Sequence, residues 1–338
     1  MPSVESVEIK RRLLQEGFHA KWQSAETIRD YVQSLPPYPA LKVRRKDWQT
    51  ESYEAPDGEQ MAVYRYGEES AHSGVLVYYH GGAYIEEILP PHFAFAEALH
   101  ALTGLAVVVP NYPTVPATTA APLNRLLAGY YDFVHSQTNG PVHLIGDSAG
   151  AALALNAAKR GIESGREAAS LTLLSPWVDV ATNNPQIQAE RLAEADVFLQ
   201  PPGLAEVGRW FAGEPGVRDP LASPLFGPFA GLPRTLVLIG TADCLLPDAR
   251  LLREKLEQEH VALRYAEFSD MMHAWPLFPM PEAMEARQMI RDFILEGTVE
   301  KPAYEEPQGA EARSAGDGDE GLLAAGSDES KDNGGRLS

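Results

Sequence analysis

The sequence predicts an α/β fold: a mostly parallel eight-stranded sheet with helices on both faces and a helical cap. Short apolar runs bounded by turn residues alternate with helical stretches, which is typical of a parallel sheet covered on both sides. The 338 residues are 44% hydrophobic, enough for a large core. No apolar run approaches the roughly 18 residues that a membrane span needs. We therefore expect one domain over residues 1–298 without a membrane span.

Eight apolar runs are predicted to be strands. They lie at residues 42–53, 61–66, 75–79, 106–110, 142–145, 171–174, 236–239 and 263–268. The first two alternate polar and apolar residues and are joined by residues 56–58 (PDG), so they are predicted to form an antiparallel hairpin at one sheet edge. The other six are predicted to be buried parallel strands.

Helical periodicity fills the intervals between these strands. The predicted helices cover residues 92–102, 120–136, 149–162, 248–259 and 281–295. Two further apolar segments, about residues 1–36 and 185–217, lie outside this alternation and are expected to form the cap. Residues 299–338 are rich in Gly, Ala, Ser, Asp and Glu and lack apolar periodicity, so they are predicted to be an acidic disordered tail.

Charge and cysteine content narrow the partners and the compartment. There are 28 Lys and Arg against 47 Asp and Glu, and the net charge of −19 argues against nucleic acid and anionic membranes as partners. The one cysteine, Cys244, excludes an internal disulfide, and the N-terminus lacks the pattern of a secretory signal. We expect a cytoplasmic protein that is a monomer or a homodimer.

A nucleophile turn is predicted at residues 146–150, which spell GDSAG. The pattern lies between a predicted strand and a predicted helix, the context in which G-x-S-x-G exposes a serine. The flanking residues are small because a sharp turn leaves no room for larger side chains. Ser148 is therefore the predicted nucleophile, and the Ala149 N–H at the start of the helix is predicted to face developing negative charge.

Further oxyanion donors are predicted at residues 80–84 (HGGAY), directly after the third strand. Glycines after a strand can turn their N–H groups into open space, and the candidates are Gly81, Gly82 and Ala83. His80 precedes the nucleophile in the chain, so it is expected to pin this loop and not to act as the base.

An acid and a base follow the last two predicted strands. Asp243 comes just after one strand and His273 lies on the loop after the other, so both are expected near Ser148 at the carboxyl edge of the sheet. The order serine, aspartate, histidine is that of an α/β-hydrolase triad, in which histidine takes the serine proton and aspartate orients the histidine. Asp248 competes for the acid role but is better explained as a capping residue of the next helix.

Large aromatic residues are candidates for the substrate pocket, although such residues more often belong to a core. The candidates are Tyr84, Trp177, Phe198, Trp210, Phe211 and Trp275. Cys244 follows the acid without a basic environment, so it is not expected to be a second nucleophile. No cluster of His, Asp and Glu has metal-ligand spacing, and the chemistry needs neither a metal nor a cofactor.

These motifs, together with residues 175–179 (SPWVD), resemble the hormone-sensitive-lipase-like branch of the α/β-hydrolase superfamily over about residues 4–295. The resemblance implies a serine carboxylesterase that acts on small or short-acyl esters under a helical cap. Its oxyanion hole would combine the glycine loop with the residue after the nucleophile. Two departures are present. Ala83 stands where many members have a third glycine, and the family's Tyr-Arg-Leu-Ala-Pro-Glu stretch appears only as residues 110–116 (PNYPTVP), without arginine and glutamate.

The predicted function is hydrolysis of a small-molecule carboxylic ester through an acyl-enzyme on Ser148. The same triad supports lactone or amide (formamide) hydrolysis and acyl transfer, so these reactions stay open. A different class of protein, a non-catalytic ligand-binding protein on this scaffold, is exemplified by hormone receptors that resemble the family but lack the triad histidine. The presence of His273 argues against that alternative.

Overall fold

A single eight-stranded sheet forms the centre of the described chain, in the order β1-β2-β4-β3-β5-β6-β7-β8. This computed structural model describes residues 1–39, 45–68 and 74–296, so the predicted tail at 299–338 lies outside the described residues. The strands are β1 (Trp48–Glu54), β2 (Gln60–Tyr66), β3 (Val75–Tyr79), β4 (Ala106–Asn111), β5 (Val142–Asp147), β6 (Ser170–Leu174), β7 (Thr235–Gly240) and β8 (Leu263–Phe268). The eight-stranded α/β fold is confirmed.

Strand pairing confirms the predicted edge hairpin. β1 pairs with β2 and β2 with β4 in antiparallel fashion, and all other neighbours are parallel. Two predictions were wrong. Within the described residues the first strand starts at Trp48, because Asp47 has a φ of 68° that breaks an extended chain. β8 is half-buried instead of buried, because it is the opposite edge of the sheet.

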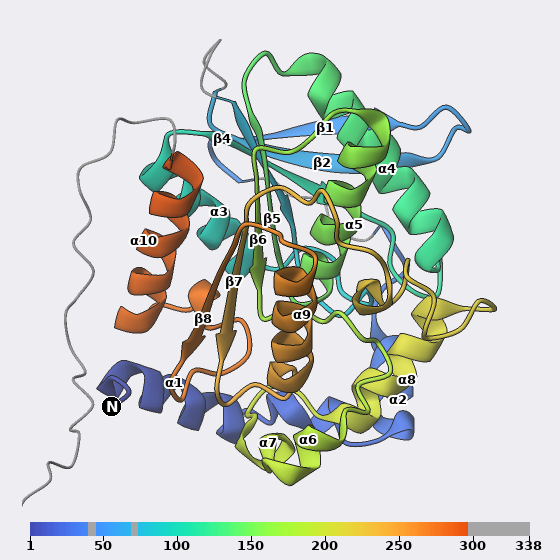
Figure 1. Cartoon of the computed structure of the whole chain (residues 1–338). Coiled ribbons are helices and arrows are strands. Elements are labelled where there is room, and N and C mark those ends of the chain that lie inside the picture. The colour runs from blue at the N-terminus through green and yellow to red at the C-terminus, as the bar shows by residue number, and fades with distance from the viewer. Residues whose placement is uncertain (40–44, 69–73, 297–338) are drawn as a thin grey trace, which may run out of the picture. The chain divides into compact units, whose positions relative to one another are not determined.

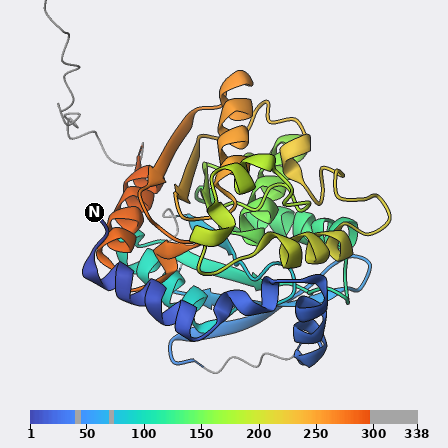
Figure 2. The ribbon, with the colours of Figure 1, turned by 90° about the horizontal axis from the view of Figure 1, so that it is seen from below.

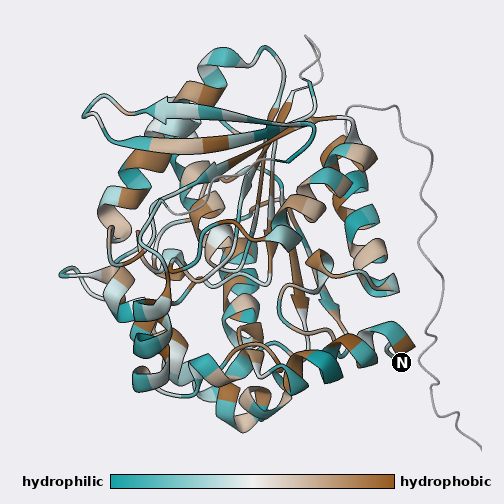
Figure 3. Cartoon of the chain, turned by 180° about the vertical axis from the view of Figure 1, so that it is seen from behind, coloured by the Kyte–Doolittle hydropathy of each residue, from teal (hydrophilic) through white to brown (hydrophobic). Residues whose placement is uncertain are grey.

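Helices cover both faces of the sheet, as predicted (Figure 1). One face packs against α3 (Pro90–Thr103) and α10 (Pro281–Leu295), and the other packs against α4 (Ala120–Gln137), α5 (Ala149–Ser164) and α9 (Leu246–Gln258). Successive residues of β3 belong to different core clusters because side chains alternate along a strand. Figure 3 shows the resulting pattern, with hydrophobic colour concentrated in the central strands.

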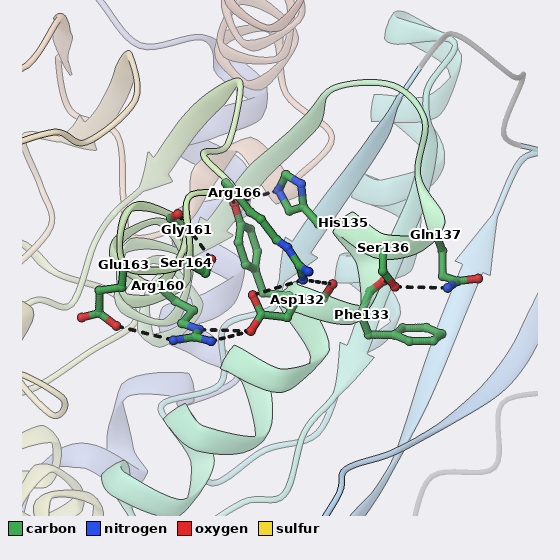
Figure 4. A network of polar contacts seen from close by, with 11 residues as sticks. Asp132, Phe133, His135, Ser136, Gln137, Arg160, Gly161, Glu163, Ser164 and Arg166 are labelled. Atoms are coloured by element: carbon green, nitrogen blue, oxygen red, sulfur yellow. Dashed lines mark hydrogen bonds and ion pairs between the residues drawn. The ribbon is translucent and has the colours of Figure 1, made fainter.

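Helix α5, which follows Ser148, is joined to α4 by a polar network (Figure 4). Asp132 on α4 accepts two hydrogen bonds from the Arg160 guanidinium on α5, at 2.6 and 3.2 Å. Arg166, just beyond α5, donates to the Asp132 carbonyl at 3.0 Å. These contacts hold the C-terminal half of α5, and therefore help to set where its N-terminus points.

Two groups of helices gather beyond the carboxyl ends of β7 and β8 (Figures 1 and 2). They are α1 (Val4–Gln15), η1 (Phe18–Trp22) and α2 (Ala25–Ser34), and then α6 (Pro185–Ala189), α7 (Leu192–Ala195) and α8 (Pro201–Ala212). The groups pack together: the Phe18 and Phe198 rings lie 5.5 Å apart, and Arg29 forms an ion pair with Glu206 at 3.1 Å. They coincide with the two segments expected to form the cap.

No helix within the described residues is both long enough and apolar enough to cross a bilayer.

Candidate active site

Ser148 lies between β5 and α5 on a strained turn. Its φ of 56° and ψ of −123° are unfavourable for a residue with a side chain, and such strain is typical of a nucleophile turn. Only glycine fits two residues further on, because a Cβ on Gly150 would lie 2.1 Å from the Tyr79 carbonyl oxygen. The Ser148 N–H donates to the Leu174 carbonyl at 2.9 Å, which anchors the turn to β6.

His273 and Asp243 form a buried hydrogen-bonded pair. The Nδ1–H of His273 donates to Asp243 Oδ2 at 2.9 Å, and the second carboxylate oxygen accepts the Leu245 N–H at 2.9 Å. Both side chains are nearly inaccessible, at 3% and 0% exposure. The structure thus brings the predicted acid and base together.

Asp248 does not pair with the histidine, and its predicted capping role was wrong. Helix α9 begins at Leu246, so Asp248 lies within its first turn and makes no capping hydrogen bond. Its carboxylate instead accepts a hydrogen bond from Asn184 Nδ2 at 2.8 Å.

The loop that carries His273 is linked to the turn that carries Ser148 through the loop after β6. The Ala274 N–H donates to Ser175 Oγ at 3.0 Å, and the Trp177 N–H donates to the Ser148 carbonyl at 3.1 Å. Burial lowers the pKa of His273, but the charge and hydrogen bond of Asp243 outweigh it, so the pKa lies above the ordinary value. The environment therefore stabilises an imidazolium, as a general base requires.

The glycine loop after β3 offers fewer oxyanion donors than predicted. The Gly81 N–H donates to Asp147 Oδ1 at 2.9 Å, so it is occupied by a carboxylate. Gly81 is therefore removed from the predicted donors. Gly82 and Ala83 follow with φ of 115° and 49°, and Ala149 is the first residue of α5. These three remain the candidate donors.

His80 pins this loop, as predicted. Its Nδ1–H donates to the Gly81 carbonyl at 2.6 Å, and its ring stacks on Tyr112 with centroids 4.3 Å apart. The Tyr112 hydroxyl donates to the His80 carbonyl at 2.5 Å. Burial and neighbouring His92 lower the pKa of His80 to about 3, so the ring is neutral and acts structurally.

Comparison with known proteins places this arrangement in a family. The family described as alpha/beta hydrolase fold matches residues 76–277. The chain belongs to the α/β-hydrolase family. The α/β-hydrolase part of the predicted resemblance is thereby confirmed.

Relatives and solved structures agree with this assignment of the hydrolase. An acetyl-hydrolase of Streptomyces hygroscopicus is 29% identical over 230 residues, covering 67% of this chain and 76% of that protein. An esterase of Acinetobacter venetianus is 29% identical over 225 residues, covering 65% of this chain and 74% of that protein. The crystal structure of an esterase from the bacterial hormone-sensitive lipase family shares the fold, with a TM-score of 0.73 at 23% identity, and covers 88% of this chain and 99% of that one.

Four of the predicted pocket aromatics of the hydrolase lie around the glycine loop and the base. The Tyr84 ring stacks on Phe211 of α8 with centroids 3.6 Å apart, and on Trp177 at 5.5 Å. The Phe198 ring lies 6.0 Å from the His273 ring. These side chains join the glycine loop, the base and the expected cap.

The other two predicted pocket aromatics are placed differently. Trp275 is fully buried on η3 (Trp275–Leu277) and packs on Phe268 at 5.0 Å, within the core cluster that contains α3 and α10. Its full burial does not separate it from Tyr84, Trp177 and Phe211, which are equally inaccessible, so its place in the pocket stays a prediction. Trp210 lies half-buried on α8 and packs against the other core cluster.

Sequence reasoning missed two buried carboxylates. Asp147 accepts hydrogen bonds from Gly81 and the Tyr78 hydroxyl, so it holds the glycine loop. Its signal in the sequence was an acidic residue inside the G-x-S-x-G pattern. Asp196 lies close to Asp243, and it carried no motif that points to a site.

Asp196, Asp243 and Cys244 place ligand atoms within 4.8 Å of one another among the described residues. The carboxylate oxygens already accept hydrogen bonds, so the cluster gives no reason to propose a metal. Burial and the nearby carboxylates raise the pKa of the Cys244 thiol well above its usual range, so it is unreactive.

Proposed function

We propose that this hydrolase cleaves carboxylic esters with small or short acyl groups through an acyl-enzyme on Ser148. That it hydrolyses esters follows from its family and from relatives named acetyl-hydrolase and esterase. The nucleophile, the mechanism and the acyl size are the content of the proposal. The observation that carries it is the 2.9 Å hydrogen bond between His273 and Asp243, formed at the sheet edge where Ser148 occupies its strained turn.

The reaction follows from the roles of these groups. Ser148 Oγ attacks the ester carbonyl carbon while Nε2 of His273 takes the hydroxyl proton, because Asp243 holds the proton on Nδ1. The tetrahedral intermediate expels the alcohol, which receives that proton from the imidazolium. A water molecule, activated by the same histidine, then attacks the acyl-enzyme, releases the carboxylic acid and returns the proton to Ser148.

Negative charge develops on the carbonyl oxygen during both attacks. The proposed donors are the N–H groups of Gly82, Ala83 and Ala149, and the last of these begins the helix whose positive end faces the site. Each such donor typically contributes about 3 to 4 kcal/mol to barrier reduction.

Several features support a small acyl group. Ala83 adds a methyl group where the family pattern has glycine, and the adjacent Tyr84 is covered by Phe211.

We propose that residues 1–36 and 185–217 act as a cap over the triad. A contact between the first segment and the chain just after the glycine loop supports this, since Lys21 forms an ion pair with Glu86 at 2.6 Å. Ser148 itself is 6% exposed, so the segments around it limit access.

A fluorophosphonate probe and a substrate panel test the proposal. The unaltered protein should be labelled with one probe per chain, and Ser148→Ala should abolish labelling and lower kcat by roughly 10⁶ while leaving the thermal unfolding transition in place. Among p-nitrophenyl esters, acetate and butyrate should be preferred over decanoate. Absence of labelling would indicate a binding protein, and faster turnover of lactones, aryl formamides or an added acyl acceptor would favour the alternative reactions.

The compartment and assembly belong to the same proposal. A sole cysteine that is buried and reduced supports a cytoplasmic location, and the charge of −19 supports neutral small-molecule substrates over nucleic acid. Cell fractionation tests the location. Light scattering on the purified protein distinguishes the monomer from the homodimer.

A further inference from the structure

Asp196 connects the expected cap to the turn that carries the catalytic acid. It follows α7 and is 2% exposed. Its Oδ1 accepts the N–H groups of Phe198 at 2.8 Å and Leu199 at 3.0 Å, and its Oδ2 accepts the N–H of Cys244 at 2.9 Å. One buried side chain therefore fixes the backbone on both sides of the junction.

The position of Asp196 is electrostatically costly. Its carboxylate and that of Asp243 lie within the 4.8 Å cluster, and two like charges removed from water repel each other. Three N–H donors and the nearby His273 imidazole compensate this charge. A buried charge that needs so much compensation adds little net stability, which makes a role in the reaction worth testing.

We propose that Asp196 is a positioning residue of the hydrolase. Through its hydrogen bonds it holds the turn of Asp243 and the backbone of Phe198 in place, and through its charge it strengthens His273 as a base. This inference rests on the proposed serine mechanism and extends it to a second carboxylate behind the triad.

The charged and titratable groups around Asp196 define the expected pH effect. Asp243 and Cys244 face it from the acid turn, and His273 faces it from the base loop, while Asp147 acts on His273 from the nucleophile turn. Burial and then the Asp243 charge raise the pKa of Asp196 to about 6. When ionised, Asp196 raises the pKa of His273, so loss of its charge lowers that pKa.

The hydrogen bonds of Asp196 also position Phe198, whose ring packs beside His273. The Phe198 ring lies 6.0 Å from His273, 5.5 Å from Phe18 and 6.1 Å from Phe278. Its backbone N–H is held by Asp196, so releasing this bond loosens a residue that packs against the imidazole. An asparagine at this position keeps one acceptor but turns its amide donor towards one of the three N–H groups.

The test compares Asp196→Asn with Asp248→Asn in the full chain. Asp248 is a matched control because it is equally buried but accepts its hydrogen bond from Asn184, away from the base. The readout is kcat/KM for p-nitrophenyl acetate as a function of pH, with thermal unfolding measured in parallel. Asp196→Asn should lower the plateau by roughly tenfold through misplacement of the acid. It should also shift the acid limb, which is the fall of kcat/KM at low pH, to lower pH by about 0.5 unit or more.

The outcomes separate this inference from the proposed function. An unlabelled, inactive unaltered protein overturns the serine mechanism itself. An active protein whose acid limb is the same with and without Asp196→Asn, or moves equally with Asp248→Asn, overturns the role of Asp196. If Asp196→Asn fails to fold, the downfield NMR resonance of the His273 Nδ1 proton in the unaltered protein decides. The chemical shift of this proton is followed as a function of pH. A second inflection near pH 6, where the pKa of Asp196 lies, supports the coupling between Asp196 and His273. A curve with a single inflection overturns that coupling.

Discussion

The backbone N–H of Gly81 donates a 2.9 Å hydrogen bond to Asp147 Oδ1, which joins the glycine loop to the residue before the nucleophile. The same oxygen accepts the Tyr78 hydroxyl at 2.6 Å. Burial raises the pKa of Asp147, but His92 and Tyr78 outweigh it and bring the pKa below the ordinary value, so the carboxylate is ionised. The loop of the proposed oxyanion donors is thus oriented by a charge on the turn that carries Ser148.

Replacement of this carboxylate should therefore impair the chemical step. Asp147→Ala is expected to lower kcat for p-nitrophenyl acetate by about 10²-fold, because the donors on Gly82 and Ala83 lose their support. Tyr78→Phe is the control, since it removes one donor to Asp147 and leaves the Gly81 hydrogen bond in place. Its kcat should fall much less. Equal losses in the two variants would contradict this explanation.

Asparagine substitutions should distinguish the two candidate acids. Asp243→Asn removes the acceptor that fixes the His273 tautomer and is expected to lower kcat by about 10⁴-fold with the fold retained. Asp248→Asn should change kcat less than about threefold, because its hydrogen bond is made with Asn184 and not with His273. The reverse order of effects would assign the acid role to Asp248.

Activity should depend on pH through His273. The base is active when neutral, and its pKa is raised above 6.5, so kcat/KM should increase with pH through a midpoint above 6.5. The sign for stability is opposite. A raised folded-state pKa means that the stabilising contribution of His273 is complete below the unfolded value and is lost as pH rises through the folded value. The pH dependence of kcat/KM in the unaltered protein checks the first sign. The pH dependence of the thermal unfolding temperature, compared between the unaltered protein and His273→Gln, checks the second.

Glycine at the nucleophile turn should be irreplaceable. Gly150→Ala places a Cβ 2.1 Å from the Tyr79 carbonyl and 2.4 Å from the His80 carbonyl, so β3 and α5 must separate. We expect a loss of about 3 kcal/mol or more in the free energy of unfolding. Gly165→Ala is the control, because its φ is 67° but its Cβ would meet nothing within 4 Å. It should cost about 1 kcal/mol in denaturant unfolding, and similar costs for both variants would contradict the steric argument.

Acyl preference should respond to Phe211. Removing this ring with Phe211→Ala uncovers Tyr84, so the ratio of kcat/KM for hexanoate over acetate is expected to rise by about tenfold, in the range of one or two methylene groups. Phe229→Ala is a matched control, since Phe229 is equally buried in the core but stacks on Lys159 and not on the glycine loop. It should lower the unfolding temperature without changing the ratio. An unchanged ratio in Phe211→Ala would remove this ring from the pocket.

Most secondary structure was predictable because it depends on local patterns. The strands and the helices between them follow from apolar periodicity and turn residues, and β8 (Leu263–Phe268) and α10 (Pro281–Leu295) match the predicted bounds. The start of the first strand was not predictable, since a positive φ at Asp47 leaves no periodic signal. Likewise, whether Asp248 caps α9 depends on where the preceding turn ends, and its partner Asn184 is distant in sequence.

The sequence alone determined the strands from their apolar runs. It also determined the sharp turn at Ser148 and the candidates for acid and base, because each of these is a short motif at the end of an apolar run. Only the tertiary structure decided that His273 pairs with Asp243, that the Gly81 N–H is occupied by Asp147, and that Asp196 lies close to Asp243. These relationships join segments from separate loops. Which polar groups satisfy one another across such loops is set by burial and three-dimensional distance, and neither is encoded in sequence spacing.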